Sequence, residues 1–283
     1  MHKKTPRFCK QLLKLSIAAL WISALPSLAS AEDVKDKSTR TILELPSEEH
    51  EVISLIQGAK GLSVHKELYI LPLTHADRYQ GGQTEIEFQI SAKQRILKTN
   101  FYFGYTQKSF WQAYDFGNSS VFRETNYNPE IFYRTGIDTV KFGKWKMDIG
   151  FEHESNGQGG VTSRSWNRVY VAPYLPRQDS LWYFKFWYRV PVDLGVDDNP
   201  DITDFLGYGE LHYRHSFNNR HLVHAMIRGN PGTGKGAVSL NYSIPGPSDN
   251  YYYLLRLWSG YGESLIDYNR STNRIGLGFI FAR

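Results

Sequence analysis

Apolar and polar residues alternate with a period of two over most of the chain beyond residue 65. Within residues 181–190, for example, Trp182, Phe184 and Phe186 share one parity, while Lys185 lies on the other. Successive side chains of a β-strand point to opposite faces of the sheet. The alternation therefore predicts strands that each have one apolar face and one polar face.

This pattern predicts twelve strands, many of which are ten residues or longer. They lie near residues 67–75, 83–97, 99–113, 122–135, 138–155, 166–175, 180–191, 205–216, 219–229, 235–244, 249–260 and 272–282. Strands in soluble domains usually run about five or six residues, whereas a strand that crosses a membrane needs roughly 9–11. The lengths therefore favour membrane-crossing strands, and no later segment has the 18 consecutive apolar residues typical of a transmembrane helix.

Composition separates the two all-β architectures that such strands could build. Aromatic residues make up 15% of the chain, yet the mean hydropathy is −0.45. A soluble β-sandwich does not account for both values, whereas a transmembrane barrel has aromatic girdles outside and a polar lumen inside. The sequence therefore predicts an all-β fold, a transmembrane β-barrel of about twelve strands, over residues 66–283. The end of the chain, Phe281-Ala-Arg283, departs from the terminal aromatic residue that is common in such barrels.

The N-terminal segment carries the signature of export. Residues 1–31 combine a basic start, a short apolar stretch and the small-residue pattern Ala29-Ser-Ala31, which predicts a signal peptide cleaved after Ala31. Residues 32–65 are polar and are expected to form an N-terminal extension. Cys9 is the only cysteine and lies within the predicted signal, so disulfides and cysteine metal sites are not expected in the remainder.

The net charge of +5 has the same origin. Five of the 33 basic residues lie in the predicted signal, which has no acidic residue, and the other basic residues balance the 28 acidic ones. A basic surface for nucleic acid is therefore not indicated.

Candidate chemistry lies on the strand predicted at 138–155. Ile149, Phe151, His153 and Ser155 share the apolar parity, which faces lipid in a membrane barrel. On the next strand Asn167 has the apolar parity too, so an antiparallel pair would bring it beside His153.

Together these residues supply a nucleophile, a base and an orienting amide. Serine becomes a good nucleophile when an imidazole takes its proton, and an Asn carbonyl can hold the other ring nitrogen in the required tautomer. A neutral Asn costs less to desolvate than an aspartate would, and the Gly157 N–H is a candidate oxyanion donor. His-x-Ser alone is a weak motif, because a His at a strand end is usually a girdle or loop residue. Three polar residues on the apolar parity strengthen it, since such placement is costly without a use.

Other chemical motifs have structural explanations. The polar parity of Asp148, Glu152 and Glu154 points these carboxylates into the lumen, where they are expected to support the barrel. The segment Asn230–Lys235 is similar to a phosphate-binding loop, but no Ser or Thr follows the lysine, so we interpret it as a hairpin turn.

Around His153, Ser155 and Asn167 the chain resembles the outer-membrane phospholipase A family, the detergent-resistant phospholipases of bacteria. The resemblance rests on several ordered blocks between about residue 68 and the C-terminus. They include Gly150-Phe-Glu-His-Glu-Ser-Asn-Gly157, Thr162-Ser-Arg-Ser-Trp-Asn-Arg168, Phe122-Arg-Glu-Thr-Asn-Tyr127, Asp198-Asn-Pro-Asp-Ile-Thr203 and Gly260-Tyr-Gly-Glu-Ser-Leu-Ile-Asp-Tyr-Asn269. The blocks as a set are highly specific.

The resemblance implies a twelve-stranded antiparallel transmembrane β-barrel of the outer-membrane type. It also implies a calcium-dependent hydrolase of phospholipid acyl esters in the outer membrane of a Gram-negative bacterium. Phospholipase A1, A2 and lysophospholipase activities are all implied. By position, Ser155 would be the nucleophile, His153 the general base and Asn167 the residue that orients it.

The resemblance also implies that the enzyme is active as a homodimer and rests as a monomer. One calcium ion per active site would lie between two barrels. One barrel would contribute Ser119, with Ser120 as the alternative, and the other the Gln158 backbone carbonyl and the Ser163 side chain. Gln107 would match the family's interface glutamine.

Two departures concern the calcium chemistry. The family usually has Arg where this chain has Gln158, but that position acts through its main chain. An aspartate associated with a second calcium site in the family falls at Gly160, which puts that site in doubt. Its companion would be Asp201, which is otherwise interpreted as a turn residue.

Two rival functions fit parts of the pattern. A porin-like barrel without enzymatic activity would explain the alternation and the aromatic residues, but not Ser, His and Asn on the lipid parity. A lipid A deacylase-type barrel would also be a Ser/His hydrolase of membrane esters.

Overall fold

The computed structural model of the chain describes residues 43–44, 61–78, 84–139, 143–191, 197–217, 219–248 and 250–283. All of them belong to one unit, Thr41–Arg283. The predicted signal peptide and most of the predicted extension lie outside the described residues. No helix in the described part of the chain is long and apolar enough to cross a membrane.

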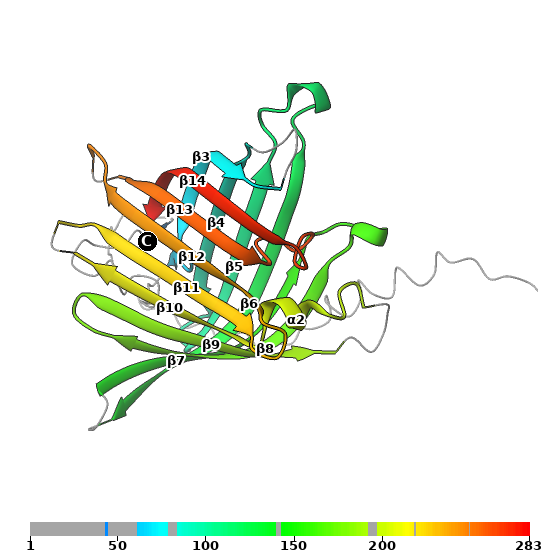
Figure 1. Cartoon of the computed structure of the whole chain (residues 1–283). Coiled ribbons are helices and arrows are strands. Elements are labelled where there is room, and N and C mark those ends of the chain that lie inside the picture. Colours follow the sequence, from blue (N-terminus) through cyan, green and yellow to red (C-terminus); the bar gives the residue numbers. More distant parts are fainter. Residues whose placement is uncertain are drawn as a thin grey trace, which may run out of the picture. The chain divides into compact units, whose positions relative to one another are not determined.

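Twelve antiparallel strands follow one another around a closed barrel (Figure 1). They are β3 (Leu68–Ala76), β4 (Ile86–Arg95), β5 (Phe101–Trp111), β6 (Phe122–Thr139), β7 (Gly143–Ser155), β8 (Ser165–Pro176), β9 (Ser180–Val190), β10 (Gly209–Ser216), β11 (Leu222–Asn230), β12 (Lys235–Pro245), β13 (Tyr252–Tyr261) and β14 (Ser271–Ala282). Each strand pairs with the next, and β14 pairs with β3 to close the sheet. The predicted twelve-stranded antiparallel barrel is therefore confirmed.

Two short strands extend the sheet on the N-terminal side of β3. The first, β1 (Leu43–Glu44), pairs in parallel with β2 (Leu62–Val64), and β2 pairs with the end of β4. Both lie within the segment that the sequence predicts as an extension. Between β2 and β3, His65 and Glu67 leave the strand pattern and bond across the lumen to Glu130 and His224.

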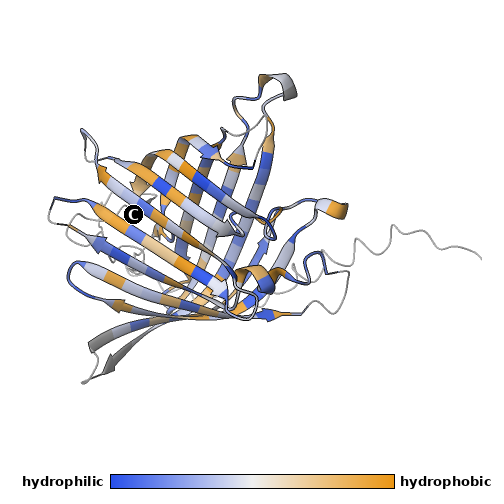
Figure 2. Ribbon diagram, in the orientation of Figure 1, coloured by the Kyte–Doolittle hydropathy of each residue, from blue (hydrophilic) through white to orange (hydrophobic). Residues whose placement is uncertain are grey.

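The outer face of the barrel is apolar, as the alternation predicts. Ile149 and Phe151 of β7 are 47% and 41% exposed, while their neighbours Asp148 and Glu152 are 1% and 0% exposed. Figure 2 shows the same alternation of hydrophobic and hydrophilic residues along neighbouring strands. Exposed apolar side chains occur on strands around the barrel, among them Leu73, Ile90, Phe103, Ile131, Val169, Phe186, Ile227, Leu240, Leu257, Ile275 and Leu277.

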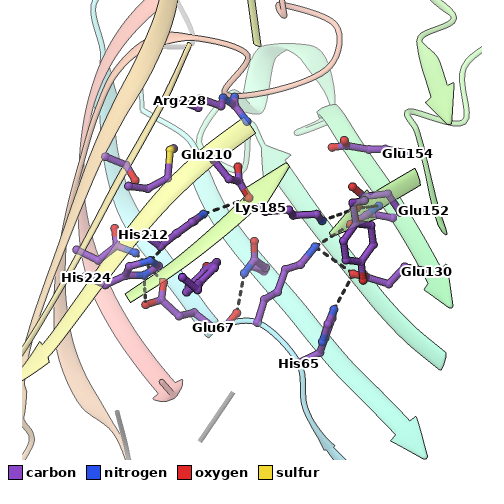
Figure 3. A pocket seen from close by; sticks show the side chains of 18 of the residues that line it. His65, Glu67, Glu130, Glu152, Glu154, Lys185, Glu210, His212, His224 and Arg228 are labelled. Carbon is purple, nitrogen blue, oxygen red and sulfur yellow. Dashed lines mark hydrogen bonds and ion pairs between the residues drawn. The ribbon is translucent and has the colours of Figure 1, made fainter. Parts of the chain in front are cut away.

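The lumen is filled with paired charges around a cavity of about 250 Å³. The labelled carboxylates, lysine and histidine rings in Figure 3 point toward one another across this space. Glu152 bonds Arg168 at 3.0 Å and Lys185 at 2.9 Å, and Asp148 bonds Arg134 at 2.6 Å. The carboxylates on the polar parity of β7 therefore support the barrel from within.

The segment before β10 corrects one detail of the sequence prediction. Residues 205–216 were expected to form one strand, but Phe205 and Leu206 belong to a short helix, α2 (Ile202–Leu206), and β10 begins at Gly209. Gly207 ends the helix at φ 72°, a conformation that favours glycine, and its N–H bonds the Thr203 carbonyl. The two apolar side chains pack against a buried aromatic cluster that includes Trp187 and Tyr268. In contrast, β11 and β12 meet as the predicted hairpin, with Asn230 opposite Lys235.

The unusual C-terminus has a structural explanation. Phe281 is 40% exposed on the outer face, so the last strand still presents an aromatic ring there, while Arg283 is 1% exposed. The Arg283 guanidinium donates to the Ser243 hydroxyl at 2.6 Å and lies 3.4 Å from the centre of the Tyr252 ring. The terminal arginine therefore ties the end of the chain to β12 and β13.

Candidate active site

Strands β7 and β8 bring the predicted base and its orienting amide together. In the antiparallel register His153 lies opposite Asn167, and Ser155 lies opposite Ser165. His153, Ser155 and Asn167 are all half-buried on the outward-facing parity. The predicted pairing of the two strands therefore places three polar residues on one patch of an otherwise apolar surface.

One hydrogen bond fixes the tautomer of the imidazole. The His153 Nδ1–H donates to Asn167 Oδ1 at 2.8 Å, and a carbonyl oxygen can only accept. Neutral imidazole carries one proton, so Nε2 keeps its lone pair. This is the state that a general base requires.

Ser155 lies two residues beyond His153 on the same face of β7. Within the described residues, no hydrogen bond joins the Ser155 hydroxyl to the His153 ring. Catalytic hydrogen bonds are often long in an enzyme without substrate and tighten in the Michaelis complex. The structure thus places both groups on one face, with the His–Asn part of the arrangement already formed.

Gly157 follows the strand in a conformation that favours glycine, with φ 67°. A Cβ at this position would lie 3.1 Å from the ring of Tyr127, which is the residue opposite Ser155 on β6. Among the described residues, the Gly157 N–H has no hydrogen-bond partner. It is therefore a donor available to a negatively charged oxygen near Ser155.

The predicted calcium ligands lie in two loops. Ser119 follows the 3-10 turn η2 (Phe116–Asn118), is exposed and has φ 60°. The Ser120 hydroxyl donates to the Ala113 carbonyl at 3.2 Å, so Ser119 is the more accessible of the two serines. Gln158 is exposed in the loop after β7, and Ser163 is half-buried and donates to Asp198 at 2.6 Å.

The predicted ligands come from two separate loops, one between β5 and β6 and the other between β7 and β8. No hydrogen bond or ion pair in the described residues joins Ser119 to Gln158 or Ser163, and no three His, Cys, Asp or Glu converge as a metal site in that part. The predicted ligands are hydroxyl and carbonyl oxygens, which are the donors that calcium prefers. Their chemistry therefore fits the ion.

Asp201 and Gly160 bear on the doubtful second calcium site. The Asp201 carboxylate accepts a hydrogen bond from the Tyr268 hydroxyl. Burial and this contact with Asp201 raise the pKa of Tyr268, so the phenol remains protonated and continues to donate. Asp201 thus has a structural partner, while Gly160 offers no side-chain ligand.

Gln107 lies on the outer face of β5 at the level of this site. It bonds the Tyr105 hydroxyl at 3.1 Å and the Ser109 hydroxyl at 3.2 Å. Its register partner is Tyr127, which in turn lies opposite Ser155. A polar row therefore runs across β5, β6 and β7 on the membrane-facing surface.

The sequence reasoning missed two buried amides beside the site. Asn199 is fully buried, and its Oδ1 accepts from the Ser165 N–H at 2.9 Å. Asn156 is 3% exposed and bonds several groups of the loop between β7 and β8. The Asn-Gly pair at 156–157 was a turn signal that could have identified the second of these.

Comparison with known proteins identifies the family. The model of the family "Phospholipase A1" matches residues 55–281. The chain is 35% identical over 255 residues to the putative phospholipase A1 of Neisseria meningitidis serogroup B, covering 80% of this chain and 66% of the relative. It is 39% identical over 203 residues to phospholipase A1 of Escherichia coli K12, covering 69% of this chain and 68% of the relative. The chain belongs to the phospholipase A1 family, so the predictions of this family and of an enzyme are confirmed.

Two solved structures share the fold. The outer membrane phospholipase of Salmonella typhi, a dimer with bound calcium, aligns with a TM-score of 0.73 and 30% identity, covering 83% of this chain and 98% of that one. Outer membrane phospholipase A from Escherichia coli aligns with a TM-score of 0.70 and 32% identity, covering 78% and 98%. Together with the apolar outer face, these relatives indicate an outer-membrane protein.

Proposed function

We propose that this protein is a calcium-dependent outer-membrane phospholipase that hydrolyses acyl esters of phospholipids through Ser155, His153 and Asn167. The observation that carries the proposal is the His153–Asn167 hydrogen bond on the lipid-facing surface, two residues from Ser155. A polar trio facing hydrocarbon costs desolvation free energy. Catalysis on the surrounding lipid would explain why polar residues occupy this surface despite the cost.

The chain's own residues account for the acyl transfer. His153 Nε2 accepts the proton of the Ser155 hydroxyl as its oxygen attacks the ester carbonyl, and Asn167 holds the resulting imidazolium in place. The Gly157 N–H donates to the developing oxyanion. His153 then protonates the leaving alkoxide, and a water attacks the acyl-enzyme with the same base.

Calcium is proposed to bind between two barrels, one ion per active site. Ser119 of one chain would bind it together with the Gln158 carbonyl and the Ser163 hydroxyl of the other. When bound, the ion supplies positive charge near the oxyanion. The calcium-bound dimer from Salmonella typhi supports this proposal, and Gln107 is proposed to lie at the interface.

This arrangement would make activity depend on association. If two chains share the ligands as proposed, a single chain has an incomplete calcium site, so we infer that the monomer is the resting form and the homodimer the active one. A hydrolase embedded in its own substrate would thereby remain silent until two barrels meet. Asp201 is proposed as a further metal ligand, and residues 1–31 are proposed to be a signal peptide cleaved during export.

Fatty-acid release by the purified wild-type protein tests the proposal. We expect release from phospholipid micelles in calcium, loss of release in EDTA, and recovery when calcium is added back. Ion conductance without any hydrolysis would favour a porin-like barrel. Release from lipopolysaccharide but not from phospholipid would favour a lipid A deacylase.

A further inference from the structure

A buried amide lies in the middle of an exposed functional loop. Asn156 is 3% exposed, although Gly157 and Gln158 beside it are exposed and Ser155 is half-buried. Burying an amide is unfavourable unless its donors and acceptor are bonded. The bonds that Asn156 makes therefore indicate what its burial achieves.

The Asn156 side chain closes the loop between β7 and β8 on itself. Its Oδ1 accepts from the Gln158 N–H at 3.2 Å and from the Arg164 N–H at 2.9 Å. Its Nδ2 donates to the Thr162 carbonyl at 2.8 Å. One side chain thus joins the start of the loop, at Gln158, to its end, at Thr162 and Arg164.

A carboxylate inside the barrel fixes the orientation of this amide. Asn156 Nδ2 also donates to Glu124 Oε2 at 3.4 Å, and Glu124 is 1% exposed on β6. Glu124 Oε1 accepts from Asn126 at 2.6 Å and from the Ile266 N–H at 3.0 Å. Because a carboxylate only accepts, the Asn156 nitrogen must face Glu124 and its oxygen must face the loop amides.

We propose that Asn156 is a positioning residue, which holds the Gly157 N–H and the Gln158 carbonyl in the directions required for the oxyanion and for calcium, and that Glu124 keeps the Asn156 amide in the working orientation. The purpose assigned to the loop rests on the proposed phospholipase function. We call the set of hydrogen bonds made by the Asn156 side chain the clamp. Its existence rests on those bonds alone. Neither residue touches the substrate, so both act through the backbone of the loop.

Amide hydrogen exchange tests the clamp without calcium or substrate. In Asn156→Ala, exchange at the Gln158 and Arg164 amides is expected to rise about tenfold, because each loses its side-chain acceptor. Asn241→Ala is the matched control, since Asn241 is also 3% exposed but bonds Glu67 and Arg256 in the lumen. Unchanged exchange at both loop amides in folded Asn156→Ala would overturn the proposal.

Calcium binding measured by calorimetry tests the purpose of the clamp. The apparent dissociation constant is expected to rise about tenfold in Asn156→Ala and to stay within about twofold of wild type in Asn241→Ala. Equal calcium affinities in Asn156→Ala and wild type would overturn the claim that Asn156 positions the Gln158 carbonyl for calcium. If the wild type binds calcium but releases no fatty acid, the proposed function fails while the clamp stands.

Exchanging the two partners tests the role of Glu124. Asn156→Asp keeps the acceptor for both loop amides but sets two carboxylates against each other, so loop exchange is expected to rise. Adding Glu124→Gln places an amide donor opposite the new carboxylate. We then expect hydrogen exchange at the loop amides and calcium affinity to return at least halfway to their wild-type values. A double variant no better than Asn156→Asp would contradict the orienting role, and this pair also serves if Asn156→Ala does not fold.

Discussion

Neighbouring residues of β7 face two different environments, the lumen and the outer surface of the barrel. Glu152 points into the lumen, is fully buried and bonds Arg168 and Lys185. His153 and Ser155 point outward among Ile149 and Phe151, and within the described residues the His153 ring bonds a neutral amide, that of Asn167. The inward carboxylate is paired with two cations, whereas the outward imidazole is paired with an uncharged group. The difference indicates that the lumen charges stabilise the barrel, while the outward polar residues remain available for chemistry.

The largest effect is expected on the outer face. Ser155→Ala should lower the rate of fatty-acid release by about 10⁴-fold or more, because the nucleophile of such an arrangement is not replaceable. The folded barrel should persist, as judged by heat-modifiable gel mobility. Ser165→Ala, at the register partner on β8, is the control and should keep most of the activity; comparable rates in Ser155→Ala and this control would contradict the account.

A lumen variant should show the opposite profile. Glu152→Ala removes the carboxylate that pairs with Lys185 and with Arg168 Nε, although Arg168 keeps Glu154 at 2.8 Å. Breaking a buried pair costs about 3–5 kcal/mol of unfolding free energy. Denaturant titration of the refolded protein measures this loss. Activity per folded molecule is expected to stay within about threefold of wild type. A much larger loss of activity per folded molecule would contradict the distinction between the two faces.

Removing the orienting amide should have a smaller effect on rate. In Asn167→Ala the His153 ring loses the acceptor that orients it while the ring itself remains, so we expect about a 10- to 100-fold decrease in kcat. Steady-state kinetics on a phospholipid substrate provide the measurement. Asn167→Asp keeps an acceptor for the Nδ1–H and should retain more activity than the alanine variant, at some cost in stability.

The smallest effect is expected at the chain end. Arg283→Ala removes a buried guanidinium that donates to the Ser243 hydroxyl and lies against Tyr252, so a loss of about 1–2 kcal/mol in unfolding free energy is expected. Catalysis should be unchanged. Equal stability to wild type would show that the terminal arginine adds no net stabilisation.

Much of this organisation is encoded locally and could be predicted. The period-two alternation gave the twelve strands and the outward parity of His153, because burial of one face leaves a mark on every second residue. The pairing of His153 with Asn167 followed from parity and from the order of the strands. The helix α2 did not follow, because Phe205 and Leu206 are apolar in either conformation. Their packing in the buried aromatic cluster determines that they form a helix and not a strand.

The residues that the sequence did not reveal depend on distant contacts. Glu124 meets both Asn156 and the Ile266 N–H, which are far from it along the chain. Arg283 bonds the Ser243 hydroxyl of β12 and lies against the Tyr252 ring of β13, which are also distant from it along the chain. No periodicity marks such residues, since their partners are set by the three-dimensional fold.

The nucleophilic role of Ser155 is the central claim, and covalent labelling tests it most directly. The wild-type protein in calcium would be treated with a long-chain sulfonyl fluoride, and the modified peptide identified by mass spectrometry. We predict that inactivation and labelling proceed together, that the label is on Ser155, and that His153→Ala slows both. Full inactivation with the label on another residue, or full activity in a protein labelled at Ser155, would contradict the account.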